Sequence, residues 1–219
     1  MPKPRALDLF CGIGGVAMGL HRAGFEVIGV DIAPQPQFPF EFIQTNAMDV
    51  DLRGFDFVWA SPPCQAHSAL RHLRLEKDYP CFIQATRQKL QGYGGPWIIE
   101  NVPGAPLKNY VQLCGSSFGL RVRRHRWFES ELFFLVPQCR HDLQGQPIDV
   151  SGTGGRRINR RQNDHGGNLN KPRSIREARE AIGIDWASRY GISQAIPPAY
   201  SEFLGRQILA HMKCLTTAQ

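Results

Sequence analysis

The chain has 219 residues, 42% hydrophobic and 21% charged, with a formal net charge of +7. This size and composition suit one globular domain, with room for a small appendage. No apolar run approaches the roughly 18–20 residues that would span a membrane, which excludes an integral membrane protein with such a helix. The N-terminal residues contain no signal-peptide apolar region, so we expect a cytoplasmic protein of bacterial or phage type. The basic charge suggests a polyanionic partner.

Six cysteines are scattered along the chain without a CxxC pair, at positions 11, 64, 81, 114, 139 and 214. This usage predicts free thiols in a reducing compartment. Cys139 and His141, with the distant His165, are candidates for partial metal ligation. Their spacing matches no standard zinc pattern, so we expect no metal.

The chain begins with a strand–turn–helix unit. Residues 6–10 form an apolar strand, residues 11–15 a glycine turn, and residues 16–24 a helix that ends at a glycine. A second strand over 26–30 ends in Asp31, and an acid at this place can bind the ribose hydroxyls of a nucleoside cofactor. The turn reads G-x-G-G and lacks the full pyrophosphate fingerprint. A nucleoside without pyrophosphate therefore fits better than a dinucleotide.

A cysteine on a stiff turn follows the fourth strand. After a third strand over 40–45, an apolar run over 55–60 forms the fourth strand and leads into Ser61-Pro62-Pro63-Cys64. The two prolines stop the strand and hold the turn rigid. A thiol at the carboxyl end of a central strand is well placed for nucleophilic attack, whereas a lone cysteine is more often an inert buried residue.

The same sheet edge is expected to collect a further acid. We expect a helix over 77–91 and a strand over 97–99 that ends in Glu100. Three strands thus end in Asp31, Cys64 and Glu100, at the edge where open sheets bind ligands. The alternation of strands and helices predicts an α/β fold with a doubly wound, mostly parallel sheet.

The second half of the chain is less regular. Residues 106–114 suggest a short helix, and residues 132–136 a strand. Between them, alternation over 121–128 would place Arg124 and Arg126 on one strand face. Such a face is either a solvated edge or a surface that recognises anions or base edges.

Residues 138–172 are rich in glycine, asparagine and arginine and predict a long basic loop. Such a loop either contacts phosphates or is disordered. Ser174 should cap a helix over 173–183, and a last helix is expected over 198–211. We therefore divide the chain into an α/β domain (1–136), a basic insert (137–172) and C-terminal helices that complete the domain (173–219).

The ordered motifs resemble those of the cytosine-C5 DNA methyltransferases, which use S-adenosylmethionine. The matching blocks are DLFCGIGG (8–15), the acid at 31, SPPCQ-x-x-S (61–68), ENVPG (100–104), RRHR (123–126), RSIREA (173–178) and SQAIPP (193–198). They occur in the family's order and cover most of the chain outside 138–172. The resemblance implies a Rossmann-like fold of the S-adenosylmethionine-dependent type.

The resemblance also implies a mechanism. Cys64 would attack C6 of cytosine and so make C5 nucleophilic. A protonated Glu100 would neutralise the charge that builds at N3, which needs a raised pKa. Arg126 would reach O2, and Arg124 would support the geometry of Cys64 and the base. In a duplex the target cytosine must first be flipped out.

Further site residues are carried over from the family motifs. The cofactor residues would be Asp8, Phe10, Gly12, Ile13, Gly14, Asp31, Ile32, Asn46, Pro62 and Gln194. Within this set, Ile32 would pack on the adenine. The nucleic-acid residues would be Gln65, Ser68, Arg156, Arg157, Arg160 and Arg161. S-adenosylhomocysteine would be the product.

The sequence departs from the family pattern at several positions. Asn46 stands where an aspartate is common, Val122 replaces a glutamine, and Ser193-Gln194 replaces Gly-Asn. About 35 loop-like residues replace a substantial target-recognition domain, which points to relaxed or short sequence specificity. A protein partner or self-association could supply the missing recognition surface.

Three functions remain open at this stage. The first is a DNA cytosine-C5 methyltransferase acting on duplex DNA with a flipped cytosine. The second is a cytosine-C5 methyltransferase acting on RNA, single strands or free nucleotide. The third is a non-catalytic nucleic-acid-binding relic, which the intact Cys64, Glu100 and Arg126 disfavour.

Overall fold

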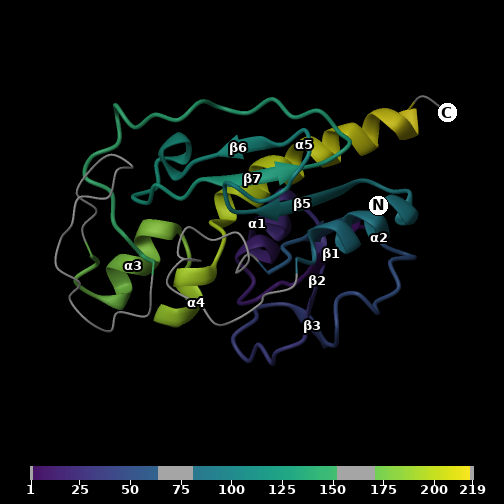
Figure 1. Ribbon diagram of the computed structural model, residues 1–219, viewed down its shortest axis with the longest axis horizontal. Helices are drawn as coiled ribbons and strands as arrows, with labels where there is room; N and C mark the ends of the chain where they lie inside the picture. The colour runs from purple at the N-terminus through teal and green to yellow at the C-terminus, as the bar shows by residue number, and fades with distance from the viewer. Residues whose placement is uncertain (1, 64–80, 152–170, 218–219) are drawn as a thin grey trace.

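The computed structural model describes residues 2–63, 81–151 and 171–217 (Figure 1). Its strands are β1 (Arg5–Leu9), β2 (Glu26–Asp31), β3 (Glu41–Gln44), β4 (Phe57–Ala60), β5 (Trp97–Asn101), β6 (Val111–Leu113) and β7 (Arg126–Glu129). Its helices are α1 (Gly15–Ala23), α2 (Ile83–Tyr93), the 3₁₀ helix η2 (Gly115–Phe118), α3 (Ile175–Ile182), α4 (Arg189–Gln194) and α5 (Pro198–Thr217). Within these ranges, no helix is both long and apolar enough to cross a membrane.

The described strands form one sheet in the order β3-β2-β1-β4-β5-β7-β6. The first five strands of this order are parallel, and β7 and β6 extend the sheet with antiparallel pairing. Leu9 pairs with Val30 and Ala60, and Ala60 pairs with Ile99, so the carboxyl ends of β1, β2, β4 and β5 lie at one edge. The predicted α/β fold with a mostly parallel sheet is confirmed.

The period-2 alternation of the strands builds a core on each face of the sheet. On β4, Phe57 and Trp59 join the cluster that contains residues of α1 and α5, whereas Val58 and Ala60 face the cluster of α2. Consecutive side chains of a strand point to opposite faces, so a fully apolar run is buried on both. Figure 1 shows α1 and α5 on one side of the sheet and α2 on the other. The central strands are thereby held rigidly beneath the site.

The prediction of a helix over 106–114 is wrong. Residues 111–113 form β6, which pairs antiparallel with β7 through Leu113 and Arg126. A three-residue strand is too short to show a periodic pattern, and its pairing with a distant strand decides its conformation.

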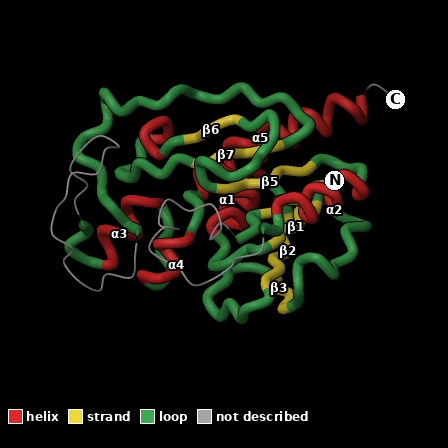
Figure 2. The backbone as a smooth tube through the Cα atoms, viewed as in Figure 1, coloured by secondary structure: helices red, strands yellow, loops and turns green. Residues whose placement is uncertain are grey.

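The prediction of a strand over 132–136 is also wrong. The chain from β7 to α3 contains no helix or strand in its described part (Figure 2). The backbone N–H of Leu135 donates to Oε1 of Gln207 at 3.1 Å, and Nε2 of Gln207 donates to the Leu135 carbonyl at 3.2 Å. A side chain of α5 therefore satisfies the backbone groups that a neighbouring strand would otherwise bind.

Other boundaries shift in ways that matter for the site. The predicted strand over 121–128 is regular only from Arg126 onward. β5 extends past Glu100 to Asn101, so the acid lies inside the strand. Ser174 caps α3 as predicted, because its Oγ accepts the N–H of Glu177 at 3.1 Å. Helix α4 had no counterpart in the sequence prediction.

The described part of the predicted insert, residues 137–151, is irregular but not fully solvated. Ile148 and Val150 are buried in a third cluster together with Val122, Ala178 and Ile192. The basic residues 156–161 lie outside the described residues. The domain boundaries that we drew from the sequence stay predictions.

Candidate active site

The turn after β1 is shaped by residues with positive φ. Phe10 has φ 59 and Gly12 has φ 49, in the left-handed region that favours glycine. A Cβ on Gly12 would meet no heavy atom within 4 Å, so this part of the turn borders open space. The backbone N–H of Gly12 donates to Oδ2 of Asp31 at 3.0 Å. The ends of β1 and β2 thus meet, with the glycine backbone and an acid side by side.

Ile32 follows Asp31 and is 72% exposed, which is unusual for isoleucine. The other oxygen of Asp31, Oδ1, accepts the N–H of Ala33 at 3.0 Å and holds this carboxylate in place. A nucleoside cofactor requires an acid that binds the ribose, an apolar surface for the adenine and a glycine turn that lets the cofactor approach the backbone closely. The residues present therefore fit such a cofactor.

The C-terminal segment closes against the glycine turn. A Cβ on Gly15 would lie 2.3 Å from the carbonyl oxygen of Ile196, so only glycine permits this contact. Trp186 donates from Nε1 to the carbonyl of Ile13 at 2.8 Å. These contacts bring the SQAIPP segment beside the turn, although about 180 residues separate them in the sequence.

Asp8 is a fully buried acid in β1, and its predicted role toward the cofactor stays a prediction. Its carboxylate is fully buried, and within the described residues neither oxygen has a hydrogen-bond partner of good geometry. Burial raises its pKa well above the usual range, the backbone N–H of Ala17 opposes this shift, and the charges of Asp31 and Glu100 add to it.

Two predicted cofactor residues use their side chains locally. Asn46 is exposed, accepts the N–H of Met48 through Oδ1 at 3.1 Å and donates from Nδ2 to Asp49 at 3.1 Å. Gln194 is exposed on α4 and donates to Oγ of Ser193 at 3.1 Å. A role of either residue toward the cofactor stays a prediction.

Glu100 and Arg126 form the charged centre of the site. Glu100 is buried in β5, and its Oε1 lies 3.0 Å from Nε of Arg126. Burial raises the pKa of Glu100 to about 7, against the opposing effects of Arg126, Ser61 and Arg124. A carboxylic acid with this pKa can hold or release a proton near neutral pH.

The turn that leads to Cys64 is anchored beside Glu100. The N–H of Ser61 donates to the Leu9 carbonyl at 3.0 Å, which continues the sheet pairing past the end of β4. Pro62 is buried, and its carbonyl accepts Nδ2 of Asn101 at 2.9 Å. The turn therefore starts at a defined position next to β5. The predicted residues Cys64, Gln65 and Ser68, like the four arginines of the insert, lie outside the described residues.

Arg124 does not share a strand face with Arg126. Its guanidinium is buried and donates to the carbonyls of Ile192 at 3.2 Å, Ser193 at 2.9 Å and Ala195. Burial, followed by the nearby charge of Arg126, lowers its pKa to about 9. Arg124 thus satisfies the carbonyls at the end of α4 and fixes the SQAIPP segment. Its predicted support of Cys64 stays a prediction.

Sequence reasoning missed Asn101 and Ser61, although both lie within the motifs that it used. Each stands next to a residue of predicted chemistry, and the hydrogen bonds of both hold the Cys64 turn to the neighbouring strands. A hollow of about 530 Å³ opens at the amino end of β5, lined by Arg87, Trp97 and Lys108 among others. No predicted site residue lines this hollow.

Comparison with known proteins finds a family model and a curated relative that match this chain. A family model described as C-5 cytosine-specific DNA methylase matches residues 5–104. A Frog virus 3 (isolate Goorha) protein named "Probable DNA (cytosine-5)-methyltransferase" is 28% identical over 156 residues, covering 59% of this chain and 72% of that protein.

Solved structures share the fold. The S. pombe Dnmt2 methyltransferase matches with a TM-score of 0.59 and 14% identity, over 96% of this chain and 99% of that chain. The Entamoeba histolytica methyltransferase EhMeth matches with a TM-score of 0.58 and 12% identity, over 97% and 99%. At these identities the likeness shows a common fold. Over residues 5–104, which include the glycine turn and the ENVPG block, this chain is similar to the C-5 cytosine-specific DNA methylase family.

Proposed function

We propose that the protein transfers a methyl group from S-adenosylmethionine to C5 of cytosine in DNA, through a covalent bond between Cys64 and C6. The observation that carries this proposal is the buried Glu100, which has a pKa of about 7 and lies 3.0 Å from Arg126, beside the turn that leads to Cys64. The family match adds the cytosine-C5 chemistry.

The cofactor would bind at the edge formed by the ends of β1 and β2. Asp31 would accept the ribose hydroxyls, Ile32 would cover the adenine, and the turn around Gly12 would admit the cofactor closely. When bound, S-adenosylmethionine supplies an electrophilic methyl group. Arg124 would keep the SQAIPP segment against this edge, because its guanidinium holds three backbone carbonyls in and beside that segment.

Residues of the chain would activate the cytosine ring for methyl transfer. The Cys64 thiolate adds to C6, and the pair of the C5–C6 double bond shifts toward N3, which takes the proton of Glu100. Arg126 stabilises the charge at O2. C5 then attacks the methyl group, whose bond to sulfur breaks with the electron pair staying on sulfur. Loss of the C5 proton to a base, expulsion of the Cys64 thiolate and return of the N3 proton to Glu100 restore the ring.

DNA is the substrate that the family favours, and the short insert suggests relaxed or short sequence specificity. Direct reading of several base pairs needs an element that enters the major groove. The described part of the insert, residues 137–151, contains no helix or strand for this purpose. The arginines of residues 156–161 would instead contact phosphates, and a partner protein or a second copy could add recognition.

The substrate is tested by methyl transfer from labelled S-adenosylmethionine. Duplex DNA, single-stranded DNA, RNA and dCMP are offered separately to the wild type, to Cys64→Ser and to the matched control Cys81→Ser. We expect label at C5 of cytosine in duplex DNA, no label with Cys64→Ser and an unchanged rate with Cys81→Ser. Label confined to RNA or dCMP would overturn DNA as the substrate. No label on any substrate would overturn the proposed methyltransferase activity.

The covalent step is tested separately with duplex DNA that contains 5-fluorocytosine. Fluorine cannot leave C5 as a cation, so the final elimination is blocked after methyl transfer. We expect a protein–DNA adduct that survives denaturation and that digestion maps to Cys64. Methylation of ordinary DNA without any such adduct would contradict the covalent mechanism and leave the methyl transfer standing.

A further inference from the structure

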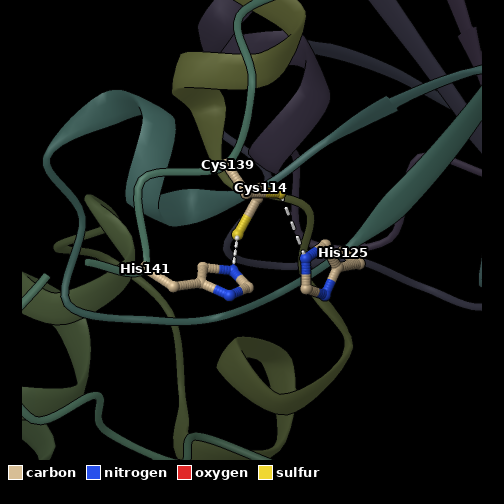
Figure 3. Close-up of side chains that lie close together, drawn as sticks. All are labelled: Cys114, His125, Cys139 and His141. Atoms are coloured by element: carbon tan, nitrogen blue, oxygen red, sulfur yellow. Dashed lines mark hydrogen bonds between the residues drawn. The ribbon is translucent and has the colours of Figure 1, made fainter. Parts of the chain in front are cut away.

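We propose that Cys114, His125, Cys139 and His141 bind one structural zinc ion. Their ligand atoms, two thiol sulfurs and two imidazole nitrogens, all lie within 4.8 Å of one another. Figure 3 shows the four side chains converging from separate parts of the backbone. The sequence prediction of no metal did not foresee this cluster, because only Cys139 and His141 are near neighbours in the chain.

The distances suit tetrahedral coordination. Sγ of Cys114 lies 3.2 Å from Nε2 of His141, and Sγ of Cys139 lies 3.4 Å from Nε2 of His125. A zinc ion with bonds of about 2.0–2.3 Å holds pairs of ligand atoms roughly 3.4–3.8 Å apart. The observed pairs are close to this spacing, so small side-chain rotations would complete the site.

The donor set selects zinc among common metals. Two thiolates with two imidazoles, in a group that closes around one point, match the structural Cys₂His₂ type, which leaves no position for substrate. Calcium and magnesium prefer oxygen ligands, and the cluster offers none. Cys114 is buried and the other three residues are half-buried, so the ion would be largely shielded from water.

Neighbouring groups already hold the ligands in place. Ser116 donates from Oγ to Sγ of Cys114 at 3.1 Å, and the same oxygen accepts the N–H of Arg140 at 3.0 Å. Ser117 donates to the carbonyl of Gln138 at 2.8 Å. The 3₁₀ helix η2 therefore binds the segment that carries Cys139 and His141, and such supporting contacts orient metal ligands.

The position of His125 gives the site a role. His125 stands between Arg124, which holds the SQAIPP segment, and Arg126, which pairs with Glu100. A zinc ion on His125 would tie this stretch to the end of β6 and to the loop after β7. It would thereby fix the start of β7, from which Arg126 reaches the acid. The metal is a positioning element here and does not touch the reacting atoms.

Metal analysis tests the site on the untagged full chain, purified under reducing conditions without chelator. We expect about one zinc per chain by mass spectrometry of the metal. After chelation, added Co²⁺ should give the visible absorption bands of a tetrahedral ion with thiolate ligands. Less than about a tenth of a zinc per chain, together with no thiolate–cobalt bands on reconstitution, would overturn the proposal.

Variants locate the metal. Cys139→Ser and His141→Asn should each lose the bound zinc, whereas the matched control Cys81→Ser/Cys214→Ser should keep it. If Cys139→Ser and His141→Asn both keep about one zinc per chain, the proposed site is wrong. If these variants fail to fold, the Co²⁺ spectrum of the wild type alone tests whether the chain binds a tetrahedral ion through thiolates.

The melting temperature gives a readout that does not depend on methyl transfer. Zinc at a hundredfold above its Kd should raise the Tm of the metal-free wild type by about 5–10 °C. Mg²⁺ at the same concentration should have no effect, and Cys139→Ser should not respond to zinc. An equal response of wild type and Cys139→Ser would place the zinc elsewhere.

Discussion

At the scale of single residues, two opposing effects set the chemistry of Glu100. Burial in β5 favours the protonated acid, and Arg126 at 3.0 Å favours the carboxylate. Burial dominates, so the pKa rises from 4.5 to about 7. The residue can therefore donate a proton near neutral pH while remaining paired with an arginine.

The raised pKa of Glu100 predicts a pH-dependent stability. The native state holds this proton more tightly than the unfolded state, so the stabilisation is complete below pH 4.5 and is lost as pH rises through about 7. The lost free energy of unfolding is on the order of 3 kcal/mol, at about 1.4 kcal/mol per pH unit. Because the buried Asp8 is present in both proteins, urea unfolding at pH 5 and pH 8 should show a loss in the wild type that exceeds the loss in Glu100→Gln by about this amount. Equal pH dependence in both proteins would contradict the assignment.

The same group predicts the pH profile of methyl transfer. If Glu100 supplies a proton to N3, kcat/KM should fall as pH rises above about 7, because this pKa belongs to the free protein. Glu100→Gln should lower kcat by about 10²–10⁴-fold and abolish this alkaline fall. Glu131→Gln, an exposed acid on the loop after β7, is the matched control and should keep the wild-type profile. An unchanged profile in Glu100→Gln would remove the acid from the mechanism.

At the scale of elements, a buried ion pair joins α2 to the antiparallel part of the sheet. Nη2 of Arg87 on α2 lies 2.7 Å from Oε2 of Glu129 on β7, and each side chain is 4% exposed. Arg87 also donates to the Pro106 carbonyl at 2.9 Å, and Glu129 accepts the N–H of Lys108 at 2.8 Å. The pair thus fixes where β7 meets β5, and with it the position of Arg126.

Removing one partner of this pair should be costly. Arg87→Met leaves Glu129 buried without its partner, and we expect a loss of about 3–5 kcal/mol in the free energy of unfolding. Arg87→Met/Glu129→Leu removes both charges and should recover most of that loss. Urea unfolding measures both variants at pH 7. A double variant as unstable as the single one would show that the cost comes from packing rather than from the unpaired charge.

Arg124 shows how an element overrides a local pattern. Alternation over 121–128 placed Arg124 and Arg126 on one face, but the strand begins only at Arg126. The carbonyls that end α4 need donors, and Arg124 supplies several from a buried position. The pairing joins residues 68–71 positions apart, so no local pattern could indicate it.

At the scale of the whole molecule, the net charge of +7 suits a polyanionic substrate, and the insert carries a concentrated share of it. Asp31 and Glu100 lie at the edge formed by the carboxyl ends of the parallel strands. Charge and size together favour binding that depends on phosphates more than on base sequence.

The insert predicts a salt-dependent affinity for DNA. Changing its arginines to glutamine, at positions 156, 157, 160 and 161, should weaken duplex binding and reduce the slope of log K against log salt by about 0.9 for each phosphate that is no longer neutralised. Fluorescence anisotropy over a salt series measures this slope. A control removes four exposed charges elsewhere, from Lys3, Arg22, Arg53 and Arg206. An equal slope for the wild type and the insert variant would refute the phosphate contacts.

The sequence by itself predicted where the parallel strands lie and the resemblance to a methyltransferase family. Apolar runs bounded by glycine or proline are local signals, and parallel strands necessarily bring their carboxyl ends to one edge. Asp31, Glu100 and the turn before Cys64 could therefore be predicted from short stretches of chain. The match over residues 5–104 agrees with those stretches.

Only the tertiary structure decided the features that depend on contacts between distant parts of the chain. The raised pKa of Glu100 depends on burial, the role of Arg124 on carbonyls from α4, and the Cys–His cluster on the end of β6, the start of β7 and the loop beyond it. The conformation of residues 132–136 depends on Gln207 of α5. Each of these joins groups far apart in the sequence, and such contacts form only when packing of the sheet brings their segments together.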